Sequence, residues 1–158
     1  MSRRVAAYAV CVEDGRVLLA RYVSPDGDGS WWTLPGGGVE PCEDPFDTVT
    51  REVAEETGYE SVVERLLGVD SRIIPAAVRR RPGADDHQNI GIFYAVRITA
   101  GTTRPEPNGE TAESVWTPIA DIPALHRAAL VDIGIALAQS NPPTGHVPPV
   151  EAGGLIEH

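Results

Sequence analysis

The sequence predicts a single domain of the α+β class, in which strands are combined with two helices. The first observation is size, because 158 residues is about the length of one domain. The second is composition, since 42% hydrophobic and 23% charged residues are typical of a chain with a buried core. The third is pattern: short apolar runs alternate with two longer segments of helical periodicity. We expect the domain over residues 1–141 and a Pro/Gly-rich flexible tail over residues 142–158.

The N-terminal part predicts strands. Val5–Val12 and Arg16–Arg21 are apolar runs that flank a turn sequence at residues 13–15, which predicts an antiparallel hairpin. Trp31–Leu34 is a short extended segment, and it is followed by a proline and three glycines at residues 35–38. We therefore expect the chain to turn at the glycines.

The segment at residues 45–57 carries the signals of an amphipathic helix. Asp44 can cap its free N–H groups, Pro45 suits the first helical position, and Gly58 supplies a stop. At 100° per residue, the helix has an apolar face and a neighbouring acidic stripe. The stripe consists of Glu52, Glu55 and Glu56.

The remainder of the chain predicts further strands and a second helix. Strands are expected at Ser61–Ile74, Asn89–Ile98 and Ser114–Thr117, with a polar surface loop over residues 75–88. Ile122–Gln139 is rich in Ala, Leu and Ile at helical spacing, and a proline near its start is tolerated there.

Charge and cysteine content limit the classes of function. Thirteen Lys and Arg against 23 Asp and Glu give a net charge of −10, which disfavours a nucleic acid duplex as partner. Bound cations would still allow small anionic substrates. Cys11 and Cys42 form neither a disulfide framework nor a zinc cluster, which favours the cytoplasm. No segment approaches the roughly 18 apolar residues of a membrane helix, so no membrane partner is expected.

Residues 37–59 read GGVEPCEDPFDTVTREVAEETGY. This segment resembles the Nudix box, G-x5-E-x7-R-E-U-x-E-E-x-G-U, where U is an aliphatic residue. The matching residues are Gly37, Glu43, Arg51, Glu52, Val53, Glu55, Glu56 and Gly58. Only Tyr59 departs from the pattern, and eight matches would arise by chance about once in 10⁹ windows.

The resemblance implies both a fold and a reaction. The implied fold is the Nudix α/β/α sandwich, with a mixed β-sheet between the box helix and a C-terminal helix. The implied reaction is Mg²⁺- or Mn²⁺-dependent cleavage of the pyrophosphate bond in a nucleoside diphosphate linked to another moiety. A (d)NTP, ADP-ribose and a sugar nucleotide are all compatible substrates. Oligomeric state is left open, and a homodimer is possible.

The acidic stripe indicates a cation site on physical grounds as well. Glu52 lies three and four residues before Glu55 and Glu56, and like charges at that spacing repel by about 0.2–0.5 kcal/mol per pair. Hard divalent cations such as Mg²⁺ or Mn²⁺ prefer such oxygen ligands. A solvated acidic helix face is the alternative for an isolated E-x-x-E-E.

The resemblance also assigns roles within the box. It implies Glu55 and Glu56 as the principal metal ligands, and Glu52 as a ligand or general base. It implies a backbone metal ligand at Gly37, where the glycine run lets ions approach closely. Arg51 is expected to pair with Glu43 and Glu52 and to orient the catalytic glutamate.

Candidates for substrate contacts lie outside the box. Arg21, Arg72 and the arginines at 79–81 are the cations available for phosphate or ribose, although a triple arginine is often a solvated patch. Trp31 and Trp32 point to opposite sides of an extended segment, so one can enter the core while the other stacks on a base.

Glu110 and Glu113 are candidates for a further acidic residue near the site, or else solvated loop carboxylates. Three functions then compete: release of pyrophosphate from a (d)NTP, cleavage within a diphosphate ester, and a non-catalytic ligand-binding or regulatory domain. The intact set of three box glutamates favours an enzyme.

Overall fold

The computed structural model describes residues 1–24, 29–79, 83–107 and 109–150, and it confirms the α+β class. In chain order the elements are β1 (Ser2–Val10), β2 (Val12–Glu13), β3 (Arg16–Val23), β4 (Ser30–Thr33), β5 (Gly36–Gly38), α1 (Pro45–Thr57), β6 (Tyr59–Ile74), the 3₁₀ helix η1 (Ala76–Val78), β7 (His87–Gly101), β8 (Thr111–Pro118), the 3₁₀ helix η2 (Ile119–Ala124) and α2 (Ala129–Ser140). None of the helices in the described ranges is long and apolar enough to cross a membrane.

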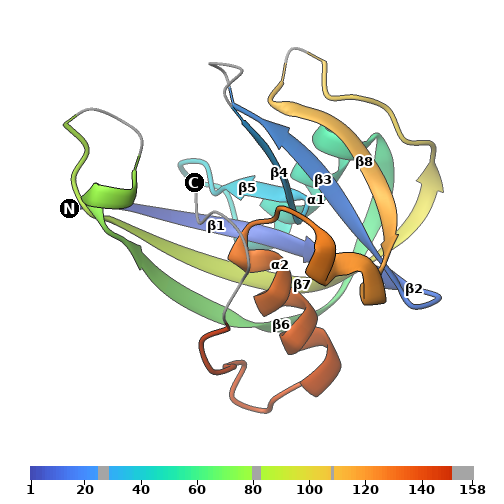
Figure 1. Ribbon diagram of the computed structural model, residues 1–158. Coiled ribbons are helices and arrows are strands. Elements are labelled where there is room, and N and C mark those ends of the chain that lie inside the picture. The colour runs from blue at the N-terminus through green and yellow to red at the C-terminus, as the bar shows by residue number, and fades with distance from the viewer. Residues whose placement is uncertain (25–28, 80–82, 108, 151–158) are drawn as a thin grey trace.

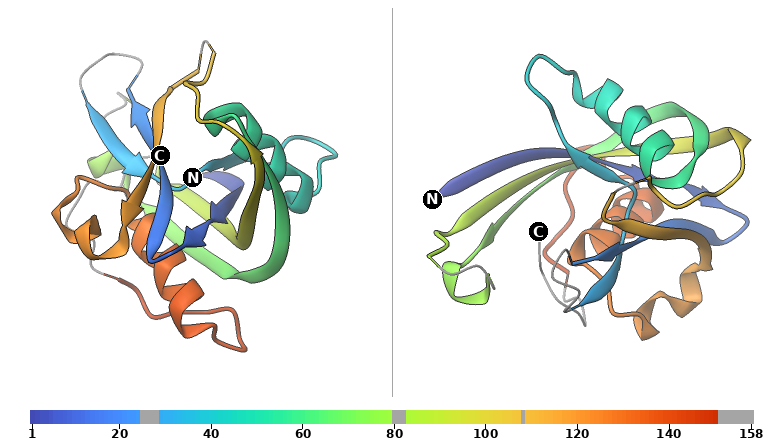
Figure 2. Two further views of the ribbon diagram at one scale, coloured as in Figure 1. Left: turned by 90° about the vertical axis from the view of Figure 1, so that its right-hand side faces the viewer. Right: turned by 90° about the horizontal axis from the view of Figure 1, so that it is seen from above.

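The strands form two sheets, with one α-helix on each side (Figures 1 and 2). The first sheet has the order β5-β1-β7-β6 and is mixed, because β1 runs parallel to β7 and antiparallel to β5. The second is antiparallel and contains β2, β3, β4 and β8. This arrangement confirms the expected sandwich, with the strands divided between two sheets.

The two helices bury opposite faces of β1. Ala7 and Ala9 pack in a cluster with Val49 and Val53 of α1. The alternate residues Ala6, Tyr8 and Val10 belong to a second cluster, which includes Phe93 and the apolar side chains of α2. Because successive side chains of a strand point to opposite faces, β1 is the divider between two cores.

The predicted N-terminal hairpin is wrong over most of its length. The turn is present, since Asp14 and Gly15 have φ angles of 50° and 71°. Only Val12 and Glu13 pair with the start of β3, however, and β1 pairs with β5 and β7 in the other sheet. The physical reason is that β1 is apolar on both faces, so it is stable only as a strand covered from both sides.

The three glycines at residues 36–38 also differ from the expectation. They form the short edge strand β5, in which Gly36, Gly37 and Gly38 pair with Tyr8, Ala7 and Ala6 of β1. Gly36 has a φ angle of 149°, and a Cβ there would overlap the carbonyl oxygen of Ala7. The glycines therefore serve close backbone approach at a sheet edge.

The second predicted helix is divided into η2 and α2. Between them, the backbone of residues 125–128 turns toward β4: Trp32 N donates to the His126 carbonyl, and Ala128 N donates to the Trp32 carbonyl. Side-chain support comes from Arg127, which forms an ion pair with Asp132 at 2.8 Å. These tertiary bonds replace the helical ones that periodicity favoured.

Residues 142–150 lie against the domain, which differs from the flexible tail expected from residue 142 onward. Val147 is buried in the α2 core cluster, and Gly145 accepts a hydrogen bond of 3.0 Å from Val69 N of β6. Residues 151–158 lie outside the described residues. So do Arg80 and Arg81 of the predicted surface loop.

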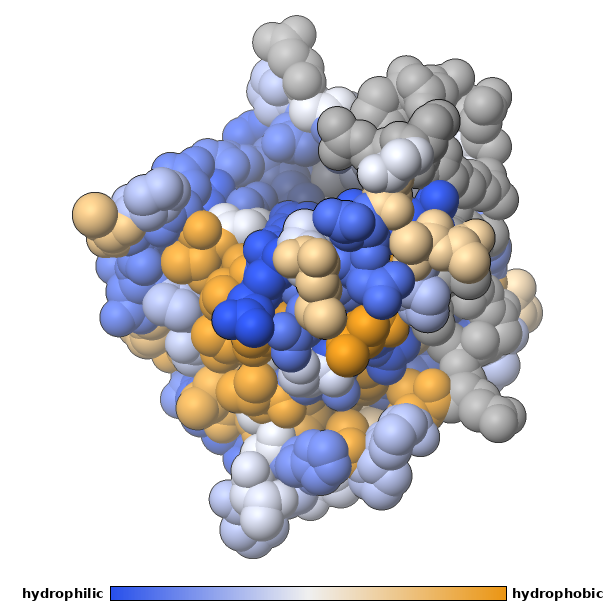
Figure 3. Space-filling model, turned by 90° about the vertical axis from the view of Figure 1, so that its left-hand side faces the viewer, coloured by the Kyte–Doolittle hydropathy of each residue, from blue (hydrophilic) through white to orange (hydrophobic). Residues whose placement is uncertain are grey.

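The end of the molecule where β1 begins carries apolar side chains among hydrophilic ones (Figure 3). Val5 and Ile73 are exposed apolar residues of the first sheet, and the exposed Met1 precedes β1. Figure 1 shows that β1, β6 and β7 extend together toward this end. The opposite end of the same strands carries the core beneath α1.

Candidate active site

Helix α1 places its acidic stripe beside β5. The Asp44 side chain accepts a hydrogen bond of 2.8 Å from Phe46 N, and Gly58 ends the helix with a φ of 81°, as the sequence predicts. Val49 and Val53 hold the helix on β1. Strand β5 pairs with β1, so it lies beside the helix. The carboxylates of Glu52 and Glu56 therefore contact the glycines of β5.

Glu52 lies directly against Gly37. A Cβ added at Gly37 would overlap the Glu52 carboxylate, so only glycine leaves room for it. The side chain of Glu52 is 14% exposed, and burial raises its pKa, while the neighbouring Arg51 lowers it. Gly37 and Glu52, both predicted as site residues, are therefore brought together.

Glu56 occupies the other end of the glycine strand. Its Oε2 accepts a hydrogen bond of 2.8 Å from Gly36 N, and its Oε1 accepts one of 3.3 Å from Thr111 Oγ1. Burial raises the pKa of Glu56 to about 8, partly offset by the Gly36 bond, and the charges of Glu52 and Glu106 raise it further. This carboxyl group is thus buried close to other carboxylates, with the Gly36 N–H and the Thr111 hydroxyl as hydrogen-bond donors.

Arg51 has the partners that the resemblance implied. Its Nε and Nη2 donate to the two oxygens of Glu43 at 2.8 and 3.0 Å, a two-pronged bond that fixes the guanidinium plane. Its Nη1 donates to Glu52 and Glu55, each at 3.1 Å. The hydrogen bonds from Arg51 lower the pKa of Glu43 to about 2, and those to Glu43 raise the pKa of Arg51.

Glu55 is more exposed than Glu52 and Glu56. Its side chain is 49% exposed, and its Oε2 is held by Arg51 at the solvent side of the helix. The structure thus separates the three predicted glutamates into two at the glycine strand and one at the surface.

The donor set fits a hydrated divalent cation. Within the described ranges no three His, Cys, Asp or Glu side chains are close enough together to hold a metal ion by themselves. Mg²⁺ is usually held by one or two carboxylates, with water and substrate phosphate completing the shell. Glu52, Glu56 and the backbone of Gly37 supply oxygens of that kind, and they lie together at the glycine strand.

A further acidic residue near Glu56 is Glu106, which sequence reasoning missed. Its Oε2 accepts a hydrogen bond of 3.2 Å from Thr111 N, next to the Thr111 hydroxyl that contacts Glu56. Its charge helps to raise the pKa of Glu56. Two flanking prolines were the only sequence signal, and they indicate a loop and no function.

The structure also places the two carboxylates that the sequence suggested for that role, Glu110 and Glu113. Glu113 pairs with Arg21 across β3 and β8, with 2.7 Å between Nε and Oε1. Glu110 is exposed, and its carbonyl accepts a hydrogen bond from Val23 N. Arg21 is therefore already paired with a carboxylate.

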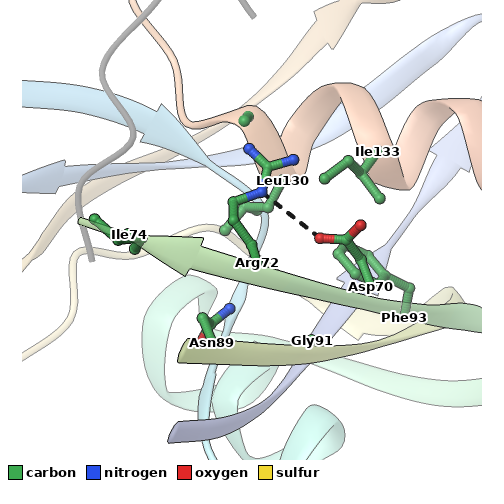
Figure 4. A pocket seen from close by; sticks show the side chains of 9 residues that line it. Asp70, Arg72, Ile74, Asn89, Gly91, Phe93, Leu130 and Ile133 are labelled. Atoms are coloured by element: carbon green, nitrogen blue, oxygen red, sulfur yellow. Dashed lines mark ion pairs between the residues drawn. The ribbon is translucent and has the colours of Figure 1, made fainter. Parts of the chain in front are cut away.

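A pocket lies on the α2 side of the first sheet (Figure 4). Arg72 and Asp70 of β6 form an ion pair of 3.6 Å at its wall, and both side chains are about one-fifth exposed. Asn89 is 93% buried, and its amide oxygen Oδ1 has no hydrogen-bond partner in the part of the chain that the structure describes. The apolar lining comes from Ile74, Phe93, Leu130 and Ile133. Of the predicted substrate contacts, Arg72 thus lines a pocket.

The two tryptophans both contribute to packing. Trp31 is 7% exposed, belongs to the α2 core cluster and packs its ring against Tyr22, with 4.4 Å between centroids. Trp32 is partly buried against the same cluster. The structure therefore places Trp31 in the core and leaves Trp32 at its margin.

The fold and this carboxylate site define a class of protein, which comparison with known sequences identifies. The family model for the NUDIX domain matches residues 1–136. The match covers most of the chain, so the chain belongs to the Nudix hydrolase family, which confirms the resemblance seen in the motif.

Individual relatives are named as a pyrophosphohydrolase and a phosphatase. An RNA pyrophosphohydrolase of Halorhodospira halophila (strain DSM 244 / SL1) is 30% identical over 125 residues, covering 72% of this chain and 67% of that protein. The 8-oxo-dGDP phosphatase NUDT18 of Homo sapiens is 32% identical over 118 residues, covering 73% of this chain. The matched region is only 32% of the human protein, so this chain spans about a third of its length.

A solved structure supports the same assignment. The MutT NUDIX hydrolase from Burkholderia pseudomallei is 30% identical and superposes with a TM-score of 0.66. The superposition covers 88% of this chain and 98% of that one.

Proposed function

We propose that this protein is a Mg²⁺- or Mn²⁺-dependent hydrolase that cleaves the pyrophosphate bond of a nucleoside diphosphate linked to another group. The observation that carries the proposal is the convergence of Glu52 and Glu56 on the glycine strand β5. The family and the names of the relatives give the reaction class, and this convergence supplies the residues for it.

Some residues of the chain would bind the cation, and Arg51 would position one of them. Glu52, Glu56 and the Gly37 backbone would hold the cation, with Glu55 as a further ligand from the surface side. A bound divalent cation neutralises phosphate charge and lowers the pKa of a coordinated water molecule. Arg51 holds Glu52 in place through Nη1, while its bonds to Glu43 keep the guanidinium fixed.

The pocket between β6, β7 and α2 carries polar groups that a substrate could contact. Its lining is apolar apart from Asp70, Arg72 and Asn89, and in this conformation it has room for little more than a water molecule. Asn89 Oδ1 has no hydrogen-bond partner among the described residues, so a donor that reaches it would satisfy a buried acceptor.

The direct test is a substrate panel with Mg²⁺ or Mn²⁺ that contains (d)NTPs, ADP-ribose and sugar nucleotides. Release of inorganic pyrophosphate would indicate a (d)NTP pyrophosphohydrolase. Phosphate that appears only after added phosphatase would indicate cleavage within a diphosphate ester. If folded protein turns over no member of the panel while it binds one of them, the non-catalytic ligand-binding domain is the better description.

A further inference from the structure

Arg4 lies beside the glycine strand on the face opposite to Glu52. It is the third residue of β1 and faces the same side as Ala6 and Tyr8, because strand residues alternate. A Cβ added at Gly38 would lie 3.3 Å from Arg4 Nε and 3.6 Å from Nη2, whereas one at Gly37 would overlap the Glu52 carboxylate. The guanidinium and the carboxylate therefore flank β5, an edge strand without side chains.

The position of Arg4 also connects the carboxylates with the pocket. In the β1–β7 register Arg4 is the partner of Asn89, and Asn89 lines the pocket. Arg4 thus lies between the glycine strand, which Glu52 and Glu56 contact, and the pocket-lining Asn89. A phosphoryl group bound at β5 on this face would meet the guanidinium.

Arg4 as a whole is partly buried, and its side chain has no hydrogen bond or ion pair with any of the other described residues. Its neighbour Arg3, by contrast, donates to Gln88 at 3.0 Å. Arg21, Arg51 and Arg72 are likewise paired with carboxylates. The charge of Arg4 nevertheless acts on the site: burial raises the pKa values of Glu52 and Tyr8, and Arg4 partly offsets both increases.

We propose that Arg4 binds a phosphoryl group of the substrate on the pocket side of Glu52 and Glu56. This inference rests on the proposed function, and it adds a substrate-binding residue that the box motif does not contain. The guanidinium fork matches two phosphate oxygens, and a partly desolvated arginine without a partner gains most from such a bond. Arg4 acts in binding, since nothing places it at the attacking water.

The test compares Arg4→Ala and Arg4→Lys with the control Arg3→Ala. Binding of inorganic pyrophosphate in the presence of Mg²⁺ is measured by calorimetry. We expect Arg4→Ala to weaken it on the order of 10- to 100-fold, Arg4→Lys to recover part of the loss, and Arg3→Ala to bind like wild type. The thermal midpoint of Arg4→Ala should stay close to wild type, because the side chain has no partner to lose.

Kinetics on the best substrate of the panel supply a second readout. KM should rise in Arg4→Ala by a similar factor, while kcat should change by less than about threefold. The reason is that a contact of equal strength in the ground state and the transition state affects substrate binding and not the chemical step. Unchanged KM and pyrophosphate affinity in an active Arg4→Ala enzyme would overturn the inference and leave the proposed function intact. An equal loss in Arg3→Ala would also overturn it, because it would indicate a general charge effect.

The hydrolase proposal can also fail while the assignment of Arg4 holds. If wild type hydrolyses nothing in the panel, but Arg4→Ala alone loses pyrophosphate affinity, the hydrolase proposal fails and the assignment of Arg4 stands.

Discussion

Two carboxylates of the same acidic segment, Glu43 and Glu56, have opposite environments. Glu43 receives the fork of Arg51, the backbone N–H of Glu40 and the hydroxyl of Thr48, and its pKa falls to about 2. Glu56 is buried near two other carboxylates, and its pKa rises to about 8. The first carboxylate is stabilised by an arginine, while the second is buried close to other carboxylates. The difference matches the roles that we propose for them, structural support for Glu43 and metal binding for Glu56.

The largest effect is expected from Glu56→Gln, which removes the carboxylate that we propose as a metal ligand. The amide keeps the shape and can still accept the Gly36 hydrogen bond, so the fold should be preserved. Loss of a ligand for a cation that stabilises the transition state should lower kcat by about 10²- to 10⁴-fold. Steady-state kinetics with saturating Mg²⁺ measure it. Near-wild-type turnover would show that Glu56 is not a ligand.

The next effect is expected from Gly37→Ala, which places a methyl group where the Glu52 carboxylate lies. Displacement of Glu52 should lower activity and Mg²⁺ affinity by about 10- to 100-fold. Gly29→Ala is the matched control, because a Cβ there meets nothing within 4 Å. Equal behaviour of the two variants would contradict the close approach of Glu52 to β5.

A smaller effect is expected from Arg51→Lys, which keeps the charge and removes the two-pronged bond to Glu43. Lysine cannot hold Glu43, Glu52 and Glu55 together with one flat group. We expect kcat/KM to fall by about tenfold, with a lower thermal midpoint. An activity loss without any change in stability would argue that Arg51 touches the substrate directly.

The smallest effect is on stability as a function of pH in the absence of metal. The folded-state pKa of Glu56, about 8, lies above the ordinary value of a glutamate. The contribution of Glu56 to the free energy of unfolding is therefore fully present below about pH 4.5 and is lost as the pH rises toward 8. Thermal midpoints of chelator-treated protein should decline over this range, and Glu56→Gln should flatten the decline.

Glu43 supplies the control with the opposite sign. Its folded-state pKa of about 2 lies below the ordinary value, so its stabilising contribution is present above about pH 4.5 and is lost as the pH falls toward 2. Glu43→Gln should reduce the acid dependence of stability and leave the alkaline side unchanged. If both variants alter the same side of the profile, the contrast between the two carboxylates is wrong.

Local signals explain which parts of the fold and site could be predicted from the sequence. The bounds of α1, its acidic stripe and the partners of Arg51 all follow from residues within one short segment. Capping, periodicity and motif spacing act over such distances. The same reasoning identified β6 and β7 from their apolar content.

Contacts between distant segments could not be predicted. The pairing of β1 with β7 joins residues more than 80 positions apart, and apolar alternation does not select between possible partners. Glu106 and Arg4 belong to no motif, and only the fold brings them to the glycine strand. The glycine run was interpreted as a turn because its role as an edge strand depends on β1.

The segment after α2 has a consequence for the behaviour of the protein at high concentration. Strand β6 is an edge of its sheet, and its exposed apolar residues include Leu66, Val69 and Ile73. An open edge of this kind invites strand addition by another molecule. Gly145 takes up the backbone N–H of Val69, and Val147 is anchored in the core beside it. The segment after α2 thus covers part of this edge, and we expect its removal to favour association between molecules.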